Sequence, residues 1–338
     1  MTNPSQLRLI RSEWFRPVSE GIGHYVPVLQ SQPGEREALA KASPQTWEHM
    51  TPLIVILGPK KRETEPFNPD RIAEWVKKVA AAIGAHPCFL HTLRVKITDR
   101  VRTAEGTCPV LEVIYAQARK RGMQFVPVLR VHDPTSRVQQ IRDAVECDGR
   151  GVAVRYPILD AASADDRGLQ ALVKDALQAV GVDVVGADLL LDLGFLSPDV
   201  EIDAADLQTS IDDLVAVGAW RSVVLMGTGM HRSLGGGVVR EGTVGRLPRR
   251  EWDLWRALRA RQQRRLPTYG DYAVQYPDPP WEGEESGPGM RANIRYTLED
   301  VTVVPRGIGP FQHEGAEQYR RLCRQIIAES NFAGPDYT

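Results

Sequence analysis

Short runs of apolar and β-branched residues recur along this chain, separated by longer stretches in which apolar residues return every three or four positions. The short runs have the length of strands. Their nearly continuous Val, Leu and Ile content is typical of strands covered on both faces, as in a parallel sheet. They predict eight strands, at Tyr25–Gln30, Leu53–Leu57, Cys88–Lys96, Gln124–Val131, Gly151–Tyr156, Asp188–Leu193, Arg221–Met226 and Tyr269–Tyr276.

The stretches between these runs have the pattern of amphipathic helices with recognisable ends. Asn68 can cap a helix that begins at Pro69, while Gly122, Gly181 and Gly218 stand where three other helices would end. Eight strands alternating with helices over about 250 residues predict an α/β fold, a (β/α)8 TIM-type barrel. A doubly wound open sheet is the alternative, although it normally uses fewer strands.

We expect three parts in the chain. The barrel spans residues 23–276, an N-terminal arm precedes it at residues 1–22, and a C-terminal elaboration follows at residues 277–338. This last part begins with a loop rich in Pro and Gly, continues as an extended stretch at Ala292–Arg306 and ends in a helix near Glu317–Ala328. We expect it to pack on the barrel.

Composition narrows the possible functions. With 42 Lys plus Arg against 43 Asp plus Glu, the formal net charge is -1, which excludes a protein that binds polyanions through bulk charge. The four cysteines (Cys88, Cys108, Cys147 and Cys323) lack the spacing of a zinc site or of a secreted disulfide scaffold. We find neither a signal peptide nor an apolar segment long enough to cross a bilayer, so we expect a cytoplasmic protein. No residue pattern indicates a cofactor or a metal site, and we expect neither.

In a barrel of this type, functional residues lie at the carboxyl ends of the strands. Alternation along the fifth and sixth strands sends Arg155 and Asp192 inward, and Asp271 shares a face of the eighth strand with Gln275. Two interpretations stay open: a structural pair of Arg155 with Asp192 or Asp271, or a pocket for an anionic ligand such as a phosphate or nucleotide. Further candidates for this pocket follow the third and fourth strands, at Arg94, Arg130 and His132.

A glycine-rich loop, Gly227–Gly237, follows the seventh strand and contains Gly227, Gly229 and His231. Its backbone N–H groups could bind phosphate, as in many barrels, or the loop could simply be a surface connection. Catalytic signals are few, since the chain has no His-x-His, His-Glu-x-x-His or Gly-x-Ser-x-Gly pattern. We therefore assign no catalytic residue and favour a protein that is not an enzyme.

Charge is segregated along the chain. Residues 175–220 contain ten acids and no Lys or Arg, whereas residues 240–265 contain nine arginines and three acids. Such segments either form solvated helix faces or bind partners, and the arginine-rich one could also bind nucleic acid. Because Arg and Trp are favoured at interface hot spots, the candidate partner-binding residues are Arg249, Arg250, Trp252, Trp255, Arg256 and Arg259.

Four stretches within residues 24–330 carry a family resemblance. They are Tyr25-Val26-Pro27-Val28-Leu29 leading to Thr51-Pro52-Leu53-Ile54; Leu189-Leu190-Leu191-Asp192-Leu193-Gly194; Gly270-Asp271-Tyr272 leading through Pro277 to Ala292-Asn293-Ile294-Arg295-Tyr296-Thr297; and Tyr319-Arg320 with Leu322-Cys323-Arg324. In this order the chain resembles the beta protein family, named after a protein of an enterobacterial satellite phage. The resemblance implies an antitoxin-like component of an antiphage cassette, which suppresses killing by a companion toxin. It implies no catalytic residues.

The chain departs from the family pattern at three positions. It has Gln30 and Gln32 where members commonly carry basic residues, and Val55 where an acidic residue often follows the Thr-Pro-Leu motif. A polar site at these positions would be weakened here, which favours a binding role. The leading expectation is a protein that binds and neutralises a companion effector; a barrel enzyme or sensor for a phosphorylated small molecule and a nucleic-acid-binding component remain alternatives.

Overall fold

Eight parallel strands close into a barrel in the computed structural model, which describes residues 23–56, 68–92, 95, 99–104, 106–159, 168–261, 264–278, 291–310, 315 and 317–334. The predicted arm at residues 1–22 and the candidate Arg94 lie outside these residues. Around the barrel the order is β1-β11-β9-β8-β7-β6-β3-β2, and β2 pairs with β1 to close it. The strands are β1 (Tyr25–Leu29), β2 (Leu53–Val55), β3 (Pro87–His91), β6 (Gln124–Arg130), β7 (Val152–Pro157), β8 (Ala187–Phe195), β9 (Ser222–Thr228) and β11 (Thr268–Asp271).

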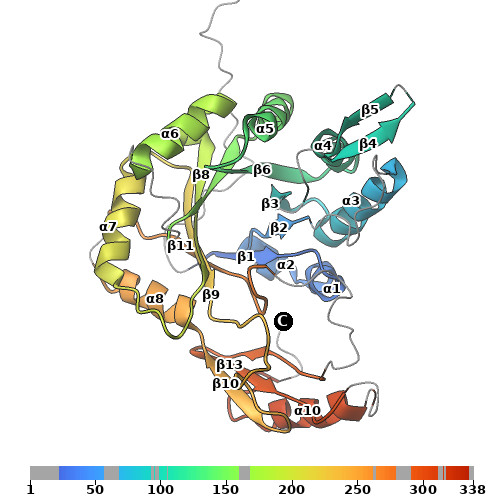
Figure 1. The fold of residues 1–338 in the computed structure, drawn as a ribbon, viewed down its shortest axis with the longest axis vertical. Helices are drawn as coiled ribbons and strands as arrows, with labels where there is room; N and C mark the ends of the chain where they lie inside the picture. Colours follow the sequence, from blue (N-terminus) through green and yellow to red (C-terminus); the bar gives the residue numbers. More distant parts are fainter. Residues whose placement is uncertain are drawn as a thin grey trace, which may run out of the picture.

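Helices form an outer layer around the strands (Figure 1). Neighbouring helices pack on one another from α1 through α3, α4, α5, α6 and α7 to α8. The (β/α)8 barrel predicted from the sequence is therefore confirmed. None of the described helices is long and apolar enough to cross a membrane. The helices are α1 (Pro33–Lys41), α2 (Pro44–Glu48), α3 (Pro69–Ile83), α4 (Val110–Lys120), α5 (Thr135–Asp148), α6 (Leu169–Val180), α7 (Ala204–Val215), α8 (Arg250–Arg259) and α10 (Glu317–Ile327).

Helix α3 illustrates how local sequence sets the outer layer. The side chain of Asn68 accepts a hydrogen bond from the backbone N–H of Asp70, which caps the helix at the position expected from the sequence. The apolar residues at helical spacing, from Ile72 to Ile83, are buried against the barrel. The helix ends at Gly84, whose φ of 63° is readily adopted only by glycine.

The barrel interior is filled by one apolar cluster rather than by a channel. Its members come from every barrel strand except β11, and Tyr272 contributes from just beyond that strand. Inward-facing side chains from alternate positions fill the space in layers, as expected for a barrel of this size. The cluster consists of Val26, Val28, Leu53, Val55, Phe89, Val126, Val128, Ala153, Leu190, Val224, Met226 and Tyr272.

A buried ion pair lies at the opposite end of the barrel from the strand carboxyl termini. Asp188, which is completely buried, accepts hydrogen bonds from the Arg221 guanidinium and from Ser222 Oγ, the latter at 2.7 Å. Arg221 also donates to the backbone carbonyl of Arg150 at 2.8 Å. These bonds compensate the charge of Asp188, which would otherwise be costly to bury.

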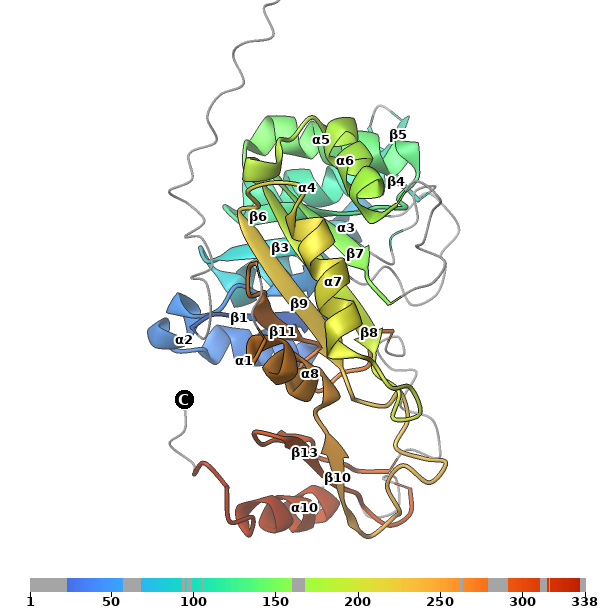
Figure 2. The same cartoon turned by 90° about the vertical axis from the view of Figure 1, so that its left-hand side faces the viewer.

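Three strands outside the barrel are not anticipated by the sequence. β4 (Arg100–Thr103) and β5 (Gly106–Pro109) form an antiparallel hairpin before α4. β10 (Val244–Pro248) lies between β9 and α8 in the sequence but outside the barrel. β10 pairs with β13 (Val301–Pro305), which in turn pairs with β12 (Tyr296–Thr297). This sheet and α10, which packs on β13, form a smaller unit beside the barrel (Figures 1 and 2).

Two predicted strands are too long at their carboxyl ends. The third ends at His91 rather than at Lys96, and the eighth ends at Asp271 rather than at Tyr276. The eighth strand ends early because Ala273 has a φ of 50°, which lies outside the range of strand residues. Its N–H bonds the Asp271 carboxylate at 2.8 Å, so the chain turns directly after the strand.

Replacement of Gly151 by alanine should strongly destabilise the barrel. A Cβ there would lie 1.9 Å from the carbonyl oxygen of Gly186, and the residue has a φ of +74°. We expect a loss of about 3 kcal/mol in the free energy of unfolding, from overpacking together with backbone strain. Urea denaturation measures it. Gly149→Ala is the matched control, because Gly149 has a φ of +63° but open space around it, and it should cost only about 1 kcal/mol. Equal losses in the two variants would contradict the proposed clash.

Candidate functional site

A layer of polar residues lies next to the apolar interior, at the carboxyl ends of the strands. His91 lies two positions beyond the inward-facing Phe89, and Arg155 and Asp192 likewise continue the inward faces of β7 and β8. Tyr272, which follows β11, extends its hydroxyl group to the same place. We call these four residues, His91, Arg155, Asp192 and Tyr272, the mouth cluster. The inward orientation predicted for Arg155 and Asp192 is confirmed.

Arg155 contacts each of the other three residues of the mouth cluster. Its Nε and Nη2 donate to Asp192 Oδ2 at 2.9 and 2.5 Å, and Nη2 also donates to the Tyr272 hydroxyl at 2.5 Å. The Tyr272 hydroxyl in turn donates to Asp192, with oxygen distances of 2.8 and 2.9 Å. Of the two pairs considered from the sequence, Arg155 with Asp192 forms and Arg155 with Asp271 does not.

The electrostatics fix the protonation states in the cluster. Burial opposes the charge of Arg155, but the adjacent Asp192 carboxylate more than offsets it and raises the pKa of this guanidinium. Burial and the nearby arginines, above all Arg155, hold the pKa of His91 well below its usual value. His91 is therefore neutral near pH 7. Because its Nδ1 lies 2.8 Å from Nη1 of Arg155, which can only donate, the ring proton resides on Nε2.

Other mouth candidates have different environments. Arg130, whose side chain is 42% exposed, is oriented by Asp133 through Nε and Nη2 bonds of 3.1 and 3.0 Å. His132 is exposed on the turn that follows. Gln275 lies in the loop beyond β11, where its carbonyl accepts a bond from Thr228 Oγ1 at 3.3 Å. It does not share a strand face with Asp271, as the sequence had led us to expect, because the strand has already ended.

In the glycine-rich loop, one predicted phosphate-binding position is occupied by a contact within the protein. The N–H of Gly229 donates to Glu251 Oε2 at 2.7 Å, so it is already used. A Cβ on Gly229 would lie 2.6 Å from the carbonyl of Pro248, and one on Gly227 would lie 3.0 Å from Leu193 Cβ. These glycines allow close packing within the protein. His231 contacts the Phe195 ring edge-on, with centroids 5.2 Å apart.

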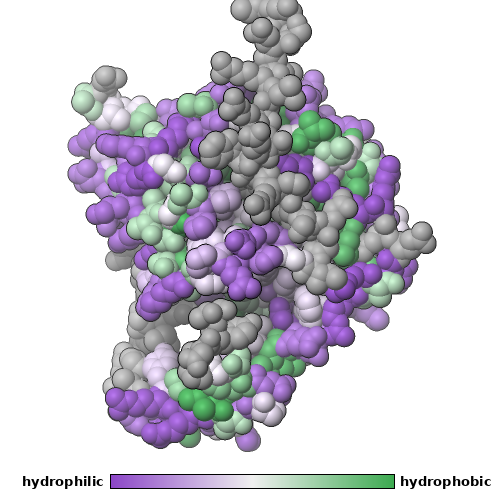
Figure 3. Space-filling model, turned by 180° about the vertical axis from the view of Figure 1, so that it is seen from behind, coloured by the Kyte–Doolittle hydropathy of each residue, from purple (hydrophilic) through white to green (hydrophobic). Residues whose placement is uncertain are grey.

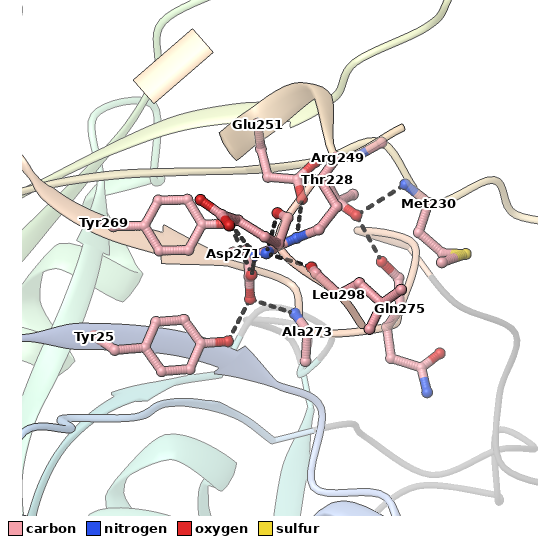
Figure 4. Close-up of polar contacts among 12 residues, drawn as sticks. Tyr25, Thr228, Met230, Arg249, Glu251, Tyr269, Asp271, Ala273, Gln275 and Leu298 are labelled. Atoms are coloured by element: carbon pink, nitrogen blue, oxygen red, sulfur yellow. Dashed lines mark hydrogen bonds and ion pairs between the residues drawn. The ribbon is translucent and has the colours of Figure 1, made fainter. Parts of the chain in front are cut away.

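Asp271 does not reach the mouth, in contrast to the sequence-based prediction. It points outward from the barrel, at the seam where β11 pairs with β1 (Figure 4). Its Oδ1 accepts from the Tyr25 hydroxyl at 2.5 Å, and its Oδ2 accepts from the Tyr269 hydroxyl at 2.9 Å and from Arg249 Nη2 at 3.3 Å. We call Tyr25, Arg249, Glu251, Tyr269 and Asp271 the seam cluster.

The proposed surface role of the arginine-rich stretch is wrong for two residues. Arg249, with a side chain only 14% exposed, pairs with Asp271 and also donates to the carbonyls of Leu298 and Glu299. Trp255 is 2% exposed, and its indole N–H donates to the Pro267 carbonyl. Composition suggested exposure, but the chain of the C-terminal unit folds back over the start of α8 and covers Arg249.

The remaining candidates of this stretch lie nearer the surface and make contacts within the protein. Arg250 donates to the Val200 carbonyl at 2.6 Å, and Arg256 pairs with Asp300 at 2.6 Å. Arg259 is exposed, with its guanidinium 5.7 Å from the Trp255 ring centroid, and Trp252, which is half-buried, stacks on Trp255. Among the described residues, no group of three or more His, Cys, Asp or Glu could hold a metal ion.

Several site residues were not selected from the sequence. His91 and Tyr272 carry half of the mouth cluster, and Tyr25 and Tyr269 hold Asp271 in the seam cluster. A signal existed for His91, since it continues the alternation of a strand whose inward residue is Phe89. For Tyr25 and Tyr269 the signal is the register that places them side by side, with rings 6.0 Å apart, and a single sequence does not specify register.

The closed ring of eight parallel strands with helices outside and a polar cluster at the strand carboxyl ends defines a (β/α)8-barrel protein. The sequence profile of the Beta protein family matches residues 25–338, and the chain belongs to this family. Comparison with curated proteins found no match. Among solved structures, a D-psicose 3-epimerase crystallised in the presence of D-fructose is similar to this chain. It is 11% identical, with a TM-score of 0.34, and the match covers 73% of this chain and 84% of that one. At that level of similarity it carries no inference about activity.

The stability of the protein should fall as pH rises through neutrality, in part because of Glu251. Burial first, and then the charge of Asp271, raise the pKa of this carboxyl from 4.5 to about 7. A carboxyl whose pKa is higher in the folded than in the unfolded state contributes stability that is complete below pH 4.5 and is lost as pH rises past 7. Glu251→Gln should therefore remove a fall of up to about 3 kcal/mol in unfolding free energy between pH 5 and pH 8.

Urea denaturation at both pH values measures the difference between the variant and the parent protein. Glu74→Gln is the control, because this residue lies exposed on α3. A Glu251→Gln variant with the same pH slope as the parent would contradict the assignment.

Proposed function

We propose that this protein acts by binding a companion effector protein through the acidic surface of α7 and the loop before it, and that it neutralises or regulates that effector within a bacterial or prophage antiphage cassette. Membership of the Beta protein family and the resemblance of the chain to its antitoxin-like namesake support this role. The observation that carries the proposal is a surface of exposed carboxylates that form no ion pair with a described Lys or Arg.

Exposed acids concentrate on this part of the barrel wall. Glu201 and Asp203 precede α7, and Asp206 and Asp213 lie one heptad apart on its outer side. None of the four forms an ion pair with a cation of the described chain. Hydrophilic residues also cover most of the described surface seen from behind in Figure 3, and apolar residues form smaller groups. Recognition by charge is favoured on such a surface, and the partner would present a basic patch.

A hollow of about 520 Å³ lies within this acidic surface, between α7 and the end of α8. Asp212 and Gln208 line it together with Arg261, whose Nε donates to Gln208 Oε1 at 2.8 Å. Asp212 Oδ1 is buried and has no hydrogen-bond partner within the described chain. A basic side chain of the partner could enter the hollow and satisfy this oxygen, which supports a specific contact rather than a diffuse charge effect.

The arginine-rich stretch is a weaker candidate for binding partners or nucleic acid. Arg246, Arg256 and Arg261 contact Glu329, Asp300 and Gln208 of the same chain. Arg250 and Arg265 donate to backbone carbonyls. Guanidinium groups engaged in this way are not available in number to neutralise phosphates, so the acidic surface is the better interface.

Charge reversal on the acidic surface tests the proposal. The triple variant Glu201→Lys, Asp206→Lys and Asp213→Lys should fold but lose its companion protein, with affinity reduced at least 100-fold. The complex is obtained by expressing the native genomic neighbourhood intact, and native mass spectrometry reports whether a stoichiometric companion remains bound. Affinity should also fall as salt concentration rises, because exposed charge pairs are screened.

The matched control is the triple variant Glu48→Lys, Glu74→Lys and Glu112→Lys, which makes the same change in net charge at exposed positions on α2, α3 and α4. It should retain the companion. If the parent protein carries no companion, or if both triple variants bind equally well, the acidic surface is not the interface.

A second candidate function is recognition of a phosphorylated small molecule at the barrel mouth. The mouth cluster favours it, because Arg155 is fixed by Asp192 and Tyr272 and because neutral His91 carries its proton on Nε2. Arg130, held by Asp133 and 42% exposed, could contact the anion. Rigid, already paired groups at strand ends are how barrels place charge around a ligand.

A nucleotide or phosphate ester that binds there should raise the melting temperature by mass action. Arg130→Gln should remove most of that shift, and Arg142→Gln, which changes an exposed arginine on α5, should not. Arg155→Ala is unsuitable as the first variant, because it would leave Asp192 buried without its cation. The absence of a shift with any of a panel of nucleotides at millimolar concentration would count against this function.

A further inference from the structure

The seam between β11 and β1 differs from the rest of the barrel wall. Neighbouring helices pack on one another around the outside from α1 to α8, but the described residues that follow β11, 272–278 and 291–295, form no helix on this seam. The described residues leave a pocket of about 480 Å³ there, a volume typical of sites for small ligands. Its lining includes Tyr25, Arg249, Trp252, Trp255, Tyr269 and Asp271.

Aromatic rings make up the walls of this seam pocket, and they pack against one another. Trp252 stacks on Trp255 with centroids 5.2 Å apart, and both meet Tyr269 edge-on, at 5.0 and 5.7 Å. Tyr25 lies parallel to Tyr269 from the neighbouring strand. Four rings from β1, β11 and α8 therefore surround one space.

Hydrogen bonds hold the walls in place. Asp271 accepts from the hydroxyls of both tyrosines, which fixes the orientation of each ring (Figure 4). The Arg249 guanidinium lies 5.5 Å from the Trp252 centroid and 5.8 Å from that of Tyr269, so it packs against both rings. Ala273, at the rim, keeps its left-handed backbone through the N–H bond to Asp271. Walls fixed before binding lose little conformational entropy when a ligand enters.

The charges at the base of the pocket compensate one another. Arg249 pairs with Asp271 at 3.3 Å, and its other donors bond the Tyr269 hydroxyl and backbone carbonyls. Glu251 lies 3.5 Å from Arg249, and burial with the charge of Asp271 raises its pKa to about 7, so in its protonated form it leaves a single neutral ion pair at the base. At the rim, burial and the proximity of His49 lower the pKa of His24 to about 4, so this imidazole is uncharged near pH 7. An anion or a cation entering the pocket would find no unpaired counter-charge, whereas a neutral ring would find apolar and π surface.

We propose that the seam pocket is a binding site for an uncharged planar aromatic molecule, of the size of a free nucleobase or an indole. The ligand packs against the rings of Tyr25 and Trp252, and its binding does not depend on the barrel mouth or on the acidic surface. The site is therefore independent of the companion-binding role.

Titration of the full-length protein with indole and with adenine tests the site. Both should bind in a saturable way by ligand-detected NMR, and adenine, which does not emit in the tryptophan range, should also quench tryptophan fluorescence because it contacts Trp252 directly. Their charged counterparts, tryptamine and adenosine monophosphate, should bind at least 10-fold more weakly, since the pocket offers no counter-charge. Saturable binding of neither neutral ring up to millimolar concentration would overturn the proposal, and so would preferential binding of a charged counterpart.

Two variants locate the binding. Thr297→Trp places a bulky side chain at an exposed position on the pocket wall, removes none of the rings and should reduce affinity at least 10-fold. Trp252→Leu removes one wall and should do the same, with ligand-detected NMR replacing fluorescence as the readout. Trp47→Leu is the matched control, because Trp47 stacks on His86 and does not line the pocket. Binding that survives Thr297→Trp, or that is lost in Trp47→Leu, would place the ligand elsewhere and overturn the proposal.

Discussion

The pairing of β1 with β11 is the contact on which the rest of the structure depends. It joins the first strand of the barrel to the last, with Tyr25 opposite Tyr269 and Pro27 opposite Asp271. Once this register is fixed, the inner or outer position of each residue along both strands is fixed too, because side chains alternate with a period of two. Val26 then faces the interior, while Tyr25 and Asp271 meet outside, so one register creates both the filled core and the polar seam.

The inward or outward direction of a side chain at the barrel mouth can be predicted where the strand has a clear apolar alternation. Where the strand lacks this alternation, the prediction is wrong. In β7 and β8 the apolar inward positions carry the pattern forward to Arg155 and Asp192, and both were placed correctly. β11 reads Thr-Tyr-Gly-Asp, which has no alternation of apolar and polar residues, so the outward direction of Asp271 could not be read from it. Turn geometry adds to this error, since the left-handed Ala273 ends the strand early.

Charge composition was a poor guide to exposure, for a physical reason. Arginine has a long side chain with five donors, and a folded chain can use them on carbonyl groups that helices and loops leave unpaired. Arg249 and Arg250 both do so at the start of α8. The carboxylates of Asp206 and Asp213 on α7 can only accept hydrogen bonds, so they cannot use carbonyl groups in this way, and they lie exposed to solvent. An arginine-rich segment beside irregular backbone is thus as consistent with internal bracing as with an interface.

The position of β10 within the chain has a consequence for synthesis. This strand is made before α8 and β11, yet its hydrogen-bonding partner β13 belongs to the last part of the chain. While the protein leaves the ribosome, the edge of β10 that β13 covers has no strand to pair with until the barrel sequence is complete. Unpaired edges invite association with other chains, so a nascent chain that stalls in this interval is the form most prone to aggregate.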